Sequence, residues 1–107
     1  MLRSIVQTAR QLGIKVALGF DATSASDQGH SANELSVMVK YGFTPLEAVQ
    51  AATLGGAELY GDKLGAIEPG NYADLIAVEG DPLADITILQ HVSFVMKDGE
   101  VVKNDPE

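Results

Sequence analysis

The stretch that decides the fold is residues 14–23, which read Ile-Lys-Val-Ala-Leu-Gly-Phe-Asp-Ala-Thr. Residues 14–19 form a short, mostly apolar run, which is typical of a buried strand. Asp21 lies just past the end of this run, where α/β enzymes commonly place catalytic groups. The stretch therefore predicts an α/β fold with Asp21 as a candidate catalytic residue. The alternative is that Asp21 only caps a helix or solvates a loop.

Length and composition limit the class of protein. A chain of 107 residues with 46% hydrophobic and 21% charged residues has room for one small globular domain. The net charge of −8 argues against nucleic acid or an anionic membrane as a partner. The absence of cysteine excludes disulfides and thiolate chemistry, and no apolar run reaches about 18 residues. We expect a soluble, cytoplasmic protein.

Residues 1–60 have the spacing of helices around the strand of residues 14–19. Apolar residues three or four apart predict a first helix that Gly13 ends: Leu2, Ile5, Val6, Ala9 and Leu12. Residues 20–29 are small and polar, which predicts a loop. Two capping boxes then predict two helix starts, one from Ser31 to Glu34 and one from Thr44 to Glu47.

The second of these helices carries an apolar stripe interrupted by two glycines. Its expected buried residues are Leu46, Val49, Ala52, Ala57 and Leu59. Gly55 and Gly56 weaken the middle of the helix. They indicate either close packing against a neighbour or a break, and the sequence leaves both open.

Residues 61–107 change to short strands and turns. Pro69 and Gly70 occupy the central positions of a type II turn, and residues 72–78 read as a strand after it. A short helical turn is expected over residues 83–89. Asp98-Gly99 then joins two apolar runs, which predicts a β-hairpin.

These motifs, in this order, resemble the C-terminal region of the amidohydrolase superfamily, in its imidazolonepropionase-like and prolidase-like branches. The resemblance is carried by VALGFDA, by residues 29–61 from GHSANELS to ELYG, by LGAIEPGNYADLIAVEGDPLADI and by VSFVMKDGEVV. It implies that residues 1–60 are the last strand and helices of a TIM barrel. It also implies that residues 61–107 are the C-terminal strands of a small accessory β-sandwich. Because a TIM barrel needs about 250 residues, the chain is incomplete as a single barrel.

The resemblance implies a role for two residues. Asp21 matches an aspartate that contacts a divalent metal, most often zinc, and exchanges protons with metal-bound water. Phe20 departs from the family, which usually has a hydroxyl residue there. His30 matches a histidine at the start of the following helix and is a candidate substrate-binding residue. Its alternative is an exposed residue with no such role.

The family's other metal ligands are missing from the sequence, which has no His-x-His pair and only His30 and His91 as histidines. A catalytic zinc normally takes three protein ligands. We therefore expect the isolated chain to bind divalent metal weakly or not at all. Asp27 is a further oxygen donor of the same loop, and its simplest role is that of a turn residue.

Two functions remain open. The chain is either part of a metal-dependent hydrolase acting on amide or cyclic-amide C–N bonds, inactive alone, or a stand-alone, non-catalytic domain that self-associates. Strand edges without neighbours favour self-association, and a homodimer is its simplest form.

Overall fold

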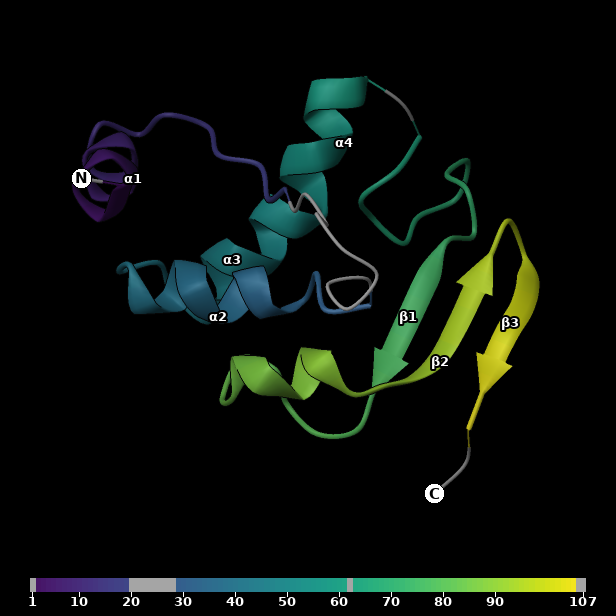
Figure 1. The fold of residues 1–107 in the computed structure, drawn as a ribbon. Helices are drawn as coiled ribbons and strands as arrows, with labels where there is room; N and C mark the ends of the chain where they lie inside the picture. The colour runs from purple at the N-terminus through teal and green to yellow at the C-terminus, as the bar shows by residue number, and fades with distance from the viewer. Residues whose placement is uncertain (1, 20–28, 62, 106–107) are drawn as a thin grey trace.

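The computed structural model describes residues 2–19, 29–61 and 63–105. Helices occupy the first half of the chain and a three-stranded antiparallel sheet the second half (Figure 1). The predicted α/β class is confirmed in this broad form. In the described ranges, no helix is long and apolar enough to cross a membrane.

Helix α1, Leu2–Gln11, forms where the apolar spacing predicts it, and it lies at one side of the molecule (Figure 1). Gly13 follows it with φ +70°, a conformation that glycine adopts without strain. Residues 14–19 are not a strand, which corrects the prediction, because they pair with no strand among the described residues. Their backbone contacts a helix instead: the Leu18 N–H donates to the Ala51 carbonyl oxygen at 3.0 Å.

Helices α2 (Asn33–Lys40) and α3 (Pro45–Ala52) follow, and only one of the two predicted capping boxes forms. At α3 the Glu47 N–H donates to Thr44 Oγ1 at 3.1 Å, and the Thr44 N–H donates to Glu47 Oε1 at 3.4 Å. At α2 no side chain caps the helix, because Ala32 takes the N-cap position in a helical conformation. The predicted capping box at Ser31 is therefore wrong.

The predicted long helix is divided into α3 and α4 (Leu54–Tyr60). The break falls at Thr53, whose φ of −119° and ψ of −80° are not helical, and not at the glycine pair. The predicted apolar stripe is also wrong at three of its five positions, since Leu46, Ala52 and Leu59 are exposed. The buried positions of α3 are Ala48 and Ala51, whose small side chains allow close approach of the neighbouring elements.

The sheet has the order β1-β2-β3, formed by β1 (Leu75–Val78), β2 (Val92–Lys97) and β3 (Glu100–Asn104). The predicted hairpin joins β2 to β3, and both turn residues have positive φ, 50° at Asp98 and 78° at Gly99. The 3₁₀ helix η2, Ile86–Gln90, takes the place of the predicted helical turn between β1 and β2.

The hydrophobic core is small and lies mainly between α2 and α3. Ile86 of η2 completes it, so the second half of the chain contributes to the core of the first. Its buried residues are Leu35, Met38, Phe43, Ala48, Ala51 and Ile86.

Candidate functional site

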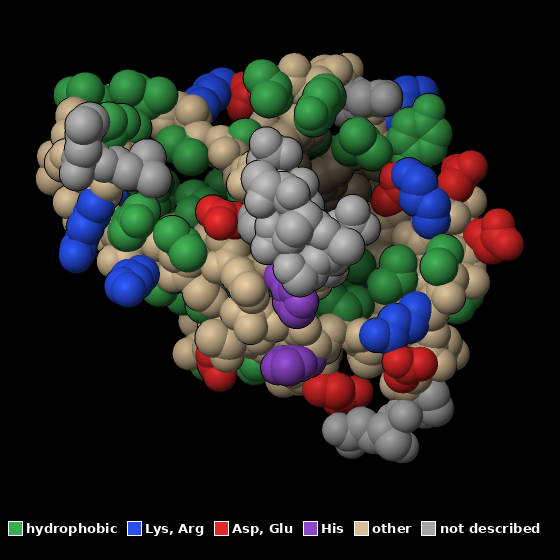
Figure 2. All heavy atoms as spheres, in the orientation of Figure 1, with side chains coloured by type: hydrophobic (Ala, Val, Ile, Leu, Met, Phe, Trp, Pro, Cys, Tyr) green, Lys and Arg blue, Asp and Glu red, His purple; other side chains and the backbone are tan. Residues whose placement is uncertain are grey.

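The two histidines are exposed side chains on the face of the molecule drawn in Figure 2. His30 precedes α2, and its carbonyl oxygen accepts the Asn33 N–H at 3.0 Å. Its neighbours Gly29 and Ser31 line a cavity of about 480 Å³ between the helices and the sheet. His30 itself does not line this cavity, and its substrate-binding role stays a prediction.

The predicted catalytic residue Asp21, and Asp27 after it, lie outside the described residues. The described residues include the segment that leads to Asp21. Val16 and Leu18 of this segment pack against the core, and the Leu18 N–H is bonded to α3. Asp21 therefore follows a segment that is held against the helices.

The side chains described here do not fit a metal centre by themselves. Over residues 2–19, 29–61 and 63–105, no three His, Cys, Asp or Glu side chains gather closely enough to hold a metal ion. A metal site that includes Asp21 would need further metal ligands from outside these residues.

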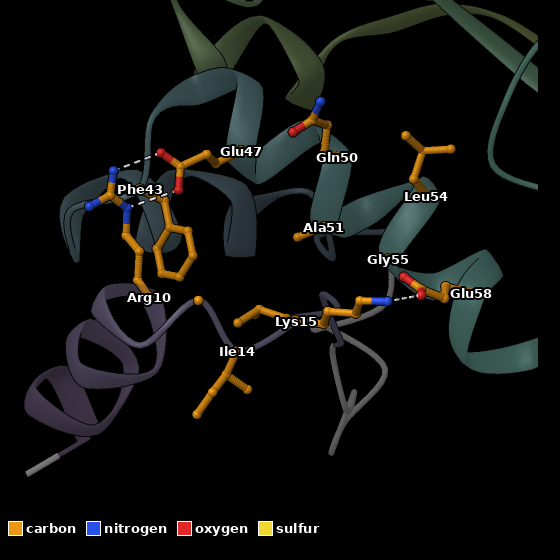
Figure 3. Close-up of a pocket in the computed structure, with 12 residues that line it drawn as sticks. Arg10, Ile14, Lys15, Phe43, Glu47, Gln50, Ala51, Leu54, Gly55 and Glu58 are labelled. Carbon is orange, nitrogen blue, oxygen red and sulfur yellow. Dashed lines mark hydrogen bonds and ion pairs between the residues drawn. The ribbon is translucent and has the colours of Figure 1, made fainter.

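A second cavity, of about 460 Å³, lies between α1, the segment after it, α3 and α4 (Figure 3). At one end Arg10 holds Glu47 with two hydrogen bonds, Nε to Oε2 at 2.8 Å and Nη2 to Oε1 at 2.7 Å. The Arg10 guanidinium also lies 5.9 Å from the centre of the Phe43 ring. At the other end Lys15 forms an ion pair with Glu58.

The charges around this cavity are already paired. The hydrogen bond from Arg10 lowers the pKa of the Glu47 carboxyl, and the same bond raises the pKa of Arg10. Glu47 therefore both caps α3 and holds α1 against it. Sequence reasoning found Glu47 through its capping box but missed Arg10, because 37 positions separate the two residues.

Comparison with known proteins decides the family. The family model described as the amidohydrolase family matches residues 2–102. The chain belongs to the amidohydrolase family. Amidohydrolases are generally metal-dependent, and the resemblance inferred from the sequence motifs is confirmed.

Solved amidohydrolase structures match the fold closely. A Xaa-Pro dipeptidase with bound methionine in its active site is 39% identical, with a TM-score of 0.89 over 95% of this chain and 25% of that one. A putative prolidase from Bifidobacterium longum is 30% identical, with a TM-score of 0.85 over 98% of this chain and 27% of that one. The prolidase-like branch is therefore supported.

Curated relatives with different activities match as well. An ochratoxinase from Aspergillus niger is 38% identical over 91% of this chain and 21% of its own length. Adenine deaminase 1 from Desulfotalea psychrophila is 31% identical over 97% of this chain and 17% of its own length. The chain thus spans about a fifth of the length of these curated relatives.

Proposed function

We propose that the chain is the C-terminal part of a metal-dependent amidohydrolase that hydrolyses C–N bonds in amide or cyclic-amide substrates, and that it is inactive alone. The observation that carries the proposal is the match of residues 2–102 to the amidohydrolase family. Relatives named ochratoxinase, adenine deaminase and Xaa-Pro dipeptidase support C–N bonds as the target.

Asp21 is the proposed catalytic and metal-contacting residue, with zinc as the proposed metal. Zinc lowers the pKa of bound water toward about 7, and a carboxylate beside it is suited to accept the proton. Since the described residues form no metal site, we propose that the other ligands come from the rest of the enzyme. His30, exposed at the start of α2, is the proposed substrate contact.

We further propose that residues 1–60 belong to the barrel and residues 61–107 to the accessory sandwich. The change from helices to strands between α4 and β1 supports this division. The contribution of Ile86 to the helical core gives the two parts a shared contact.

Reconstitution tests the proposed function. The chain is mixed with a prolidase-like relative from which the matching quarter has been deleted, and hydrolysis of Xaa-Pro dipeptides and N-acyl amino acids is measured with added zinc. We expect neither part to be active alone and the mixture to be active. Asp21→Asn should lower the rate by about 100-fold or more, whereas Asp27→Asn should stay within about twofold of the unsubstituted chain.

Two results would overturn the proposal. Turnover by the chain alone would show that it needs no other part. Equal rates for Asp21→Asn and Asp27→Asn in the mixture would remove Asp21 from the chemistry.

A self-associating, non-catalytic domain is the second candidate, and exposed apolar side chains favour it. Leu12, Leu59 and Ile67 are exposed over most of their surface. The reconstitution separates the two candidates. Hydrolysis by the mixture favours the hydrolase, and a stable oligomer of the chain that neither binds nor activates the deleted relative favours the second candidate.

A further inference from the structure

Strand β3 lies at the edge of the sheet opposite β1 (Figure 1). It pairs with β2 on one side, and no strand among the described residues pairs with its other side. All of its residues are exposed, and its two valines, Val101 and Val102, are 51% and 67% exposed. An edge strand of this kind presents unpaired N–H and C=O groups that are suited to pairing with another strand.

A β-bulge in β3 places its two charged residues on the same face of the sheet. Glu100 lies opposite Lys97 of β2. Lys103 lies opposite Val95, so Val102 is the extra residue of the bulge. Because Lys97 and Val95 are two positions apart in β2, they and their partners in β3 share one face. Without the bulge, Glu100 and Lys103 would be three positions apart in a regular strand and would lie on opposite faces.

This arrangement makes the edge of β3 complementary to itself. In two antiparallel copies of β3 related by a twofold axis between Val101 and Val102, Glu100 of each copy lies opposite Lys103 of the other. Val101 of each copy lies opposite Val102 of the other. Opposite charges directly across two strands stabilise their pairing, and so do apolar pairs. A shift of one residue in either direction removes both charge pairs, so the charges select this register.

Neither charged residue has a strong partner within the chain. Among the residues that the structure describes, Glu100 makes no ion pair, because Lys97 opposite it binds Asp74 at 2.9 Å instead. Lys103 Nζ lies 3.4 Å from Asp105 Oδ2, and both of these side chains are exposed. Exposed ion pairs contribute little to stability, so Lys103 can exchange Asp105 for a glutamate of a second copy.

We propose that two copies of the chain pair through their β3 strands, which joins their sheets into one antiparallel sheet across a twofold axis. The closed symmetry covers the edge of β3 in both copies. The other edge strand, β1, has the sequence Leu-Ile-Ala-Val and offers no charge pair that would select a register. This inference goes beyond the proposed function, since it involves neither metal nor substrate.

Charge reversal tests the register. Glu100→Lys and Lys103→Glu each place like charges opposite one another in both pairs. Each variant alone should therefore dimerise at least about tenfold more weakly than the unsubstituted chain. An equal mixture of the two variants restores opposite charges in both pairs and should dimerise within about threefold of the unsubstituted chain. Sedimentation equilibrium over a range of concentrations measures the dissociation constants.

Two matched control variants make the same changes in charge outside β3. Glu79→Lys and Lys40→Glu alter exposed residues that are not part of the β3 edge. Their dissociation constants should stay within about threefold of that of the unsubstituted chain, because exposed charges far from an interface are screened by salt. The rescue by mixing cannot arise from changes within one chain, since each chain in the mixture carries the same substitution as it does alone.

Hydrogen exchange of the unsubstituted chain locates the interface without any substitution. The outward-facing amides of β3 should exchange at least about threefold more slowly at a protein concentration at which the dimer forms than at one at which it dissociates. The amides of β1, on the other edge, should exchange at the same rate at both concentrations.

Several results would contradict the proposal. A chain that is monomeric at every concentration, single variants that dimerise as well as the controls, or a mixture that stays monomeric would each overturn it. Protection of β1 instead of β3 would assign the interface to the other edge, and protection of β3 only after the deleted relative is added would assign β3 to the rest of the enzyme. If a variant fails to fold, exchange in the unsubstituted chain still decides whether a second copy covers β3.

Discussion

Asp74 shows how a single carboxylate ties the hairpin to the chain just before β1. It accepts a hydrogen bond from Lys97 Nζ at 2.9 Å and another from the Asp98 N–H at 2.7 Å. The Lys97 hydrogen bond, followed by the Asp98 N–H, lowers the pKa of the Asp74 carboxyl in the folded chain. Because the folded pKa lies below the unfolded value of about 3.9, the ionised carboxylate stabilises the fold above about pH 4. That stabilisation is lost as the pH falls through the lowered pKa.

We therefore expect Asp74→Asn to make stability less dependent on acid pH. The urea concentration at the unfolding midpoint should be measured at pH 7 and at about pH 3. Its decrease between the two pH values should be larger for the unsubstituted chain than for Asp74→Asn. Glu47 and Asp85 also have lowered pKa values, so part of the acid dependence should remain. The exposed Glu79, just after β1, provides the control variant Glu79→Gln. Equal falls for Asp74→Asn and the unsubstituted chain would contradict the expectation.

Single residues were predictable from the sequence where their partners are local. Glu47 was found because Thr44 stands three positions before it. The partner Arg10 was not, because a contact across 37 positions depends on how α1 packs. The reason for glycine at position 55 was left open in the same way. A Cβ atom there would lie 2.7 Å from the Val16 carbonyl oxygen, which belongs to a segment distant in the sequence.

Helix starts provide the sharpest test at the scale of the element, because two similar sequence patterns behave differently. We expect Thr44→Ala to destabilise the chain by about 1 kcal/mol, since it removes the side-chain acceptor for the Glu47 N–H. Ser31→Ala should stay within about 0.5 kcal/mol of the unsubstituted chain. Urea unfolding at one fixed protein concentration measures both. A loss at Ser31 equal to that at Thr44 would show that the α2 capping box forms after all.

The structure explains why the box at α2 fails. The Glu34 N–H, which Ser31 Oγ would accept in a capping box, donates instead to the Ser31 carbonyl oxygen at 3.2 Å. The Asn33 N–H and the Leu35 N–H likewise donate to carbonyl oxygens three residues earlier. Backbone carbonyl oxygens thus accept the N–H groups of the first turn of α2. The residue types alone do not show whether a side chain or the backbone accepts these N–H groups.

Other elements could be predicted as far as their signals are local. The Asp98-Gly99 turn and the end of α1 at Gly13 formed as expected, since both depend on the φ preferences of the residues themselves. The strand at residues 14–19 did not, because a strand needs a neighbour for its backbone groups. The apolar pattern of residues 14–19 indicates that they are buried, but it does not specify which element they contact.

The whole molecule is less compact than its length allows, which bears on its state of assembly. Its radius of gyration is 14.6 Å, against about 13 Å for a compact domain of 107 residues. Large apolar side chains remain outside the core, with Ile67 87% exposed and Tyr60 80% exposed. Every residue of β3 is exposed, and β3 is an edge strand of the sheet. Apolar surface and open edges of this kind are normally covered by a partner.

We therefore expect the isolated chain to form an oligomer, most simply a twofold dimer, because closed twofold symmetry is the commonest way to cover the same surface on two copies. Light scattering coupled to size exclusion at micromolar concentration should give at least twice the chain mass of 11.3 kDa. In the reconstitution mixture the deleted relative should compete with this self-association, since both would cover the same apolar surface. A monomer with cooperative unfolding would contradict the prediction, because it would mean that a chain this open is stable with its apolar side chains in water.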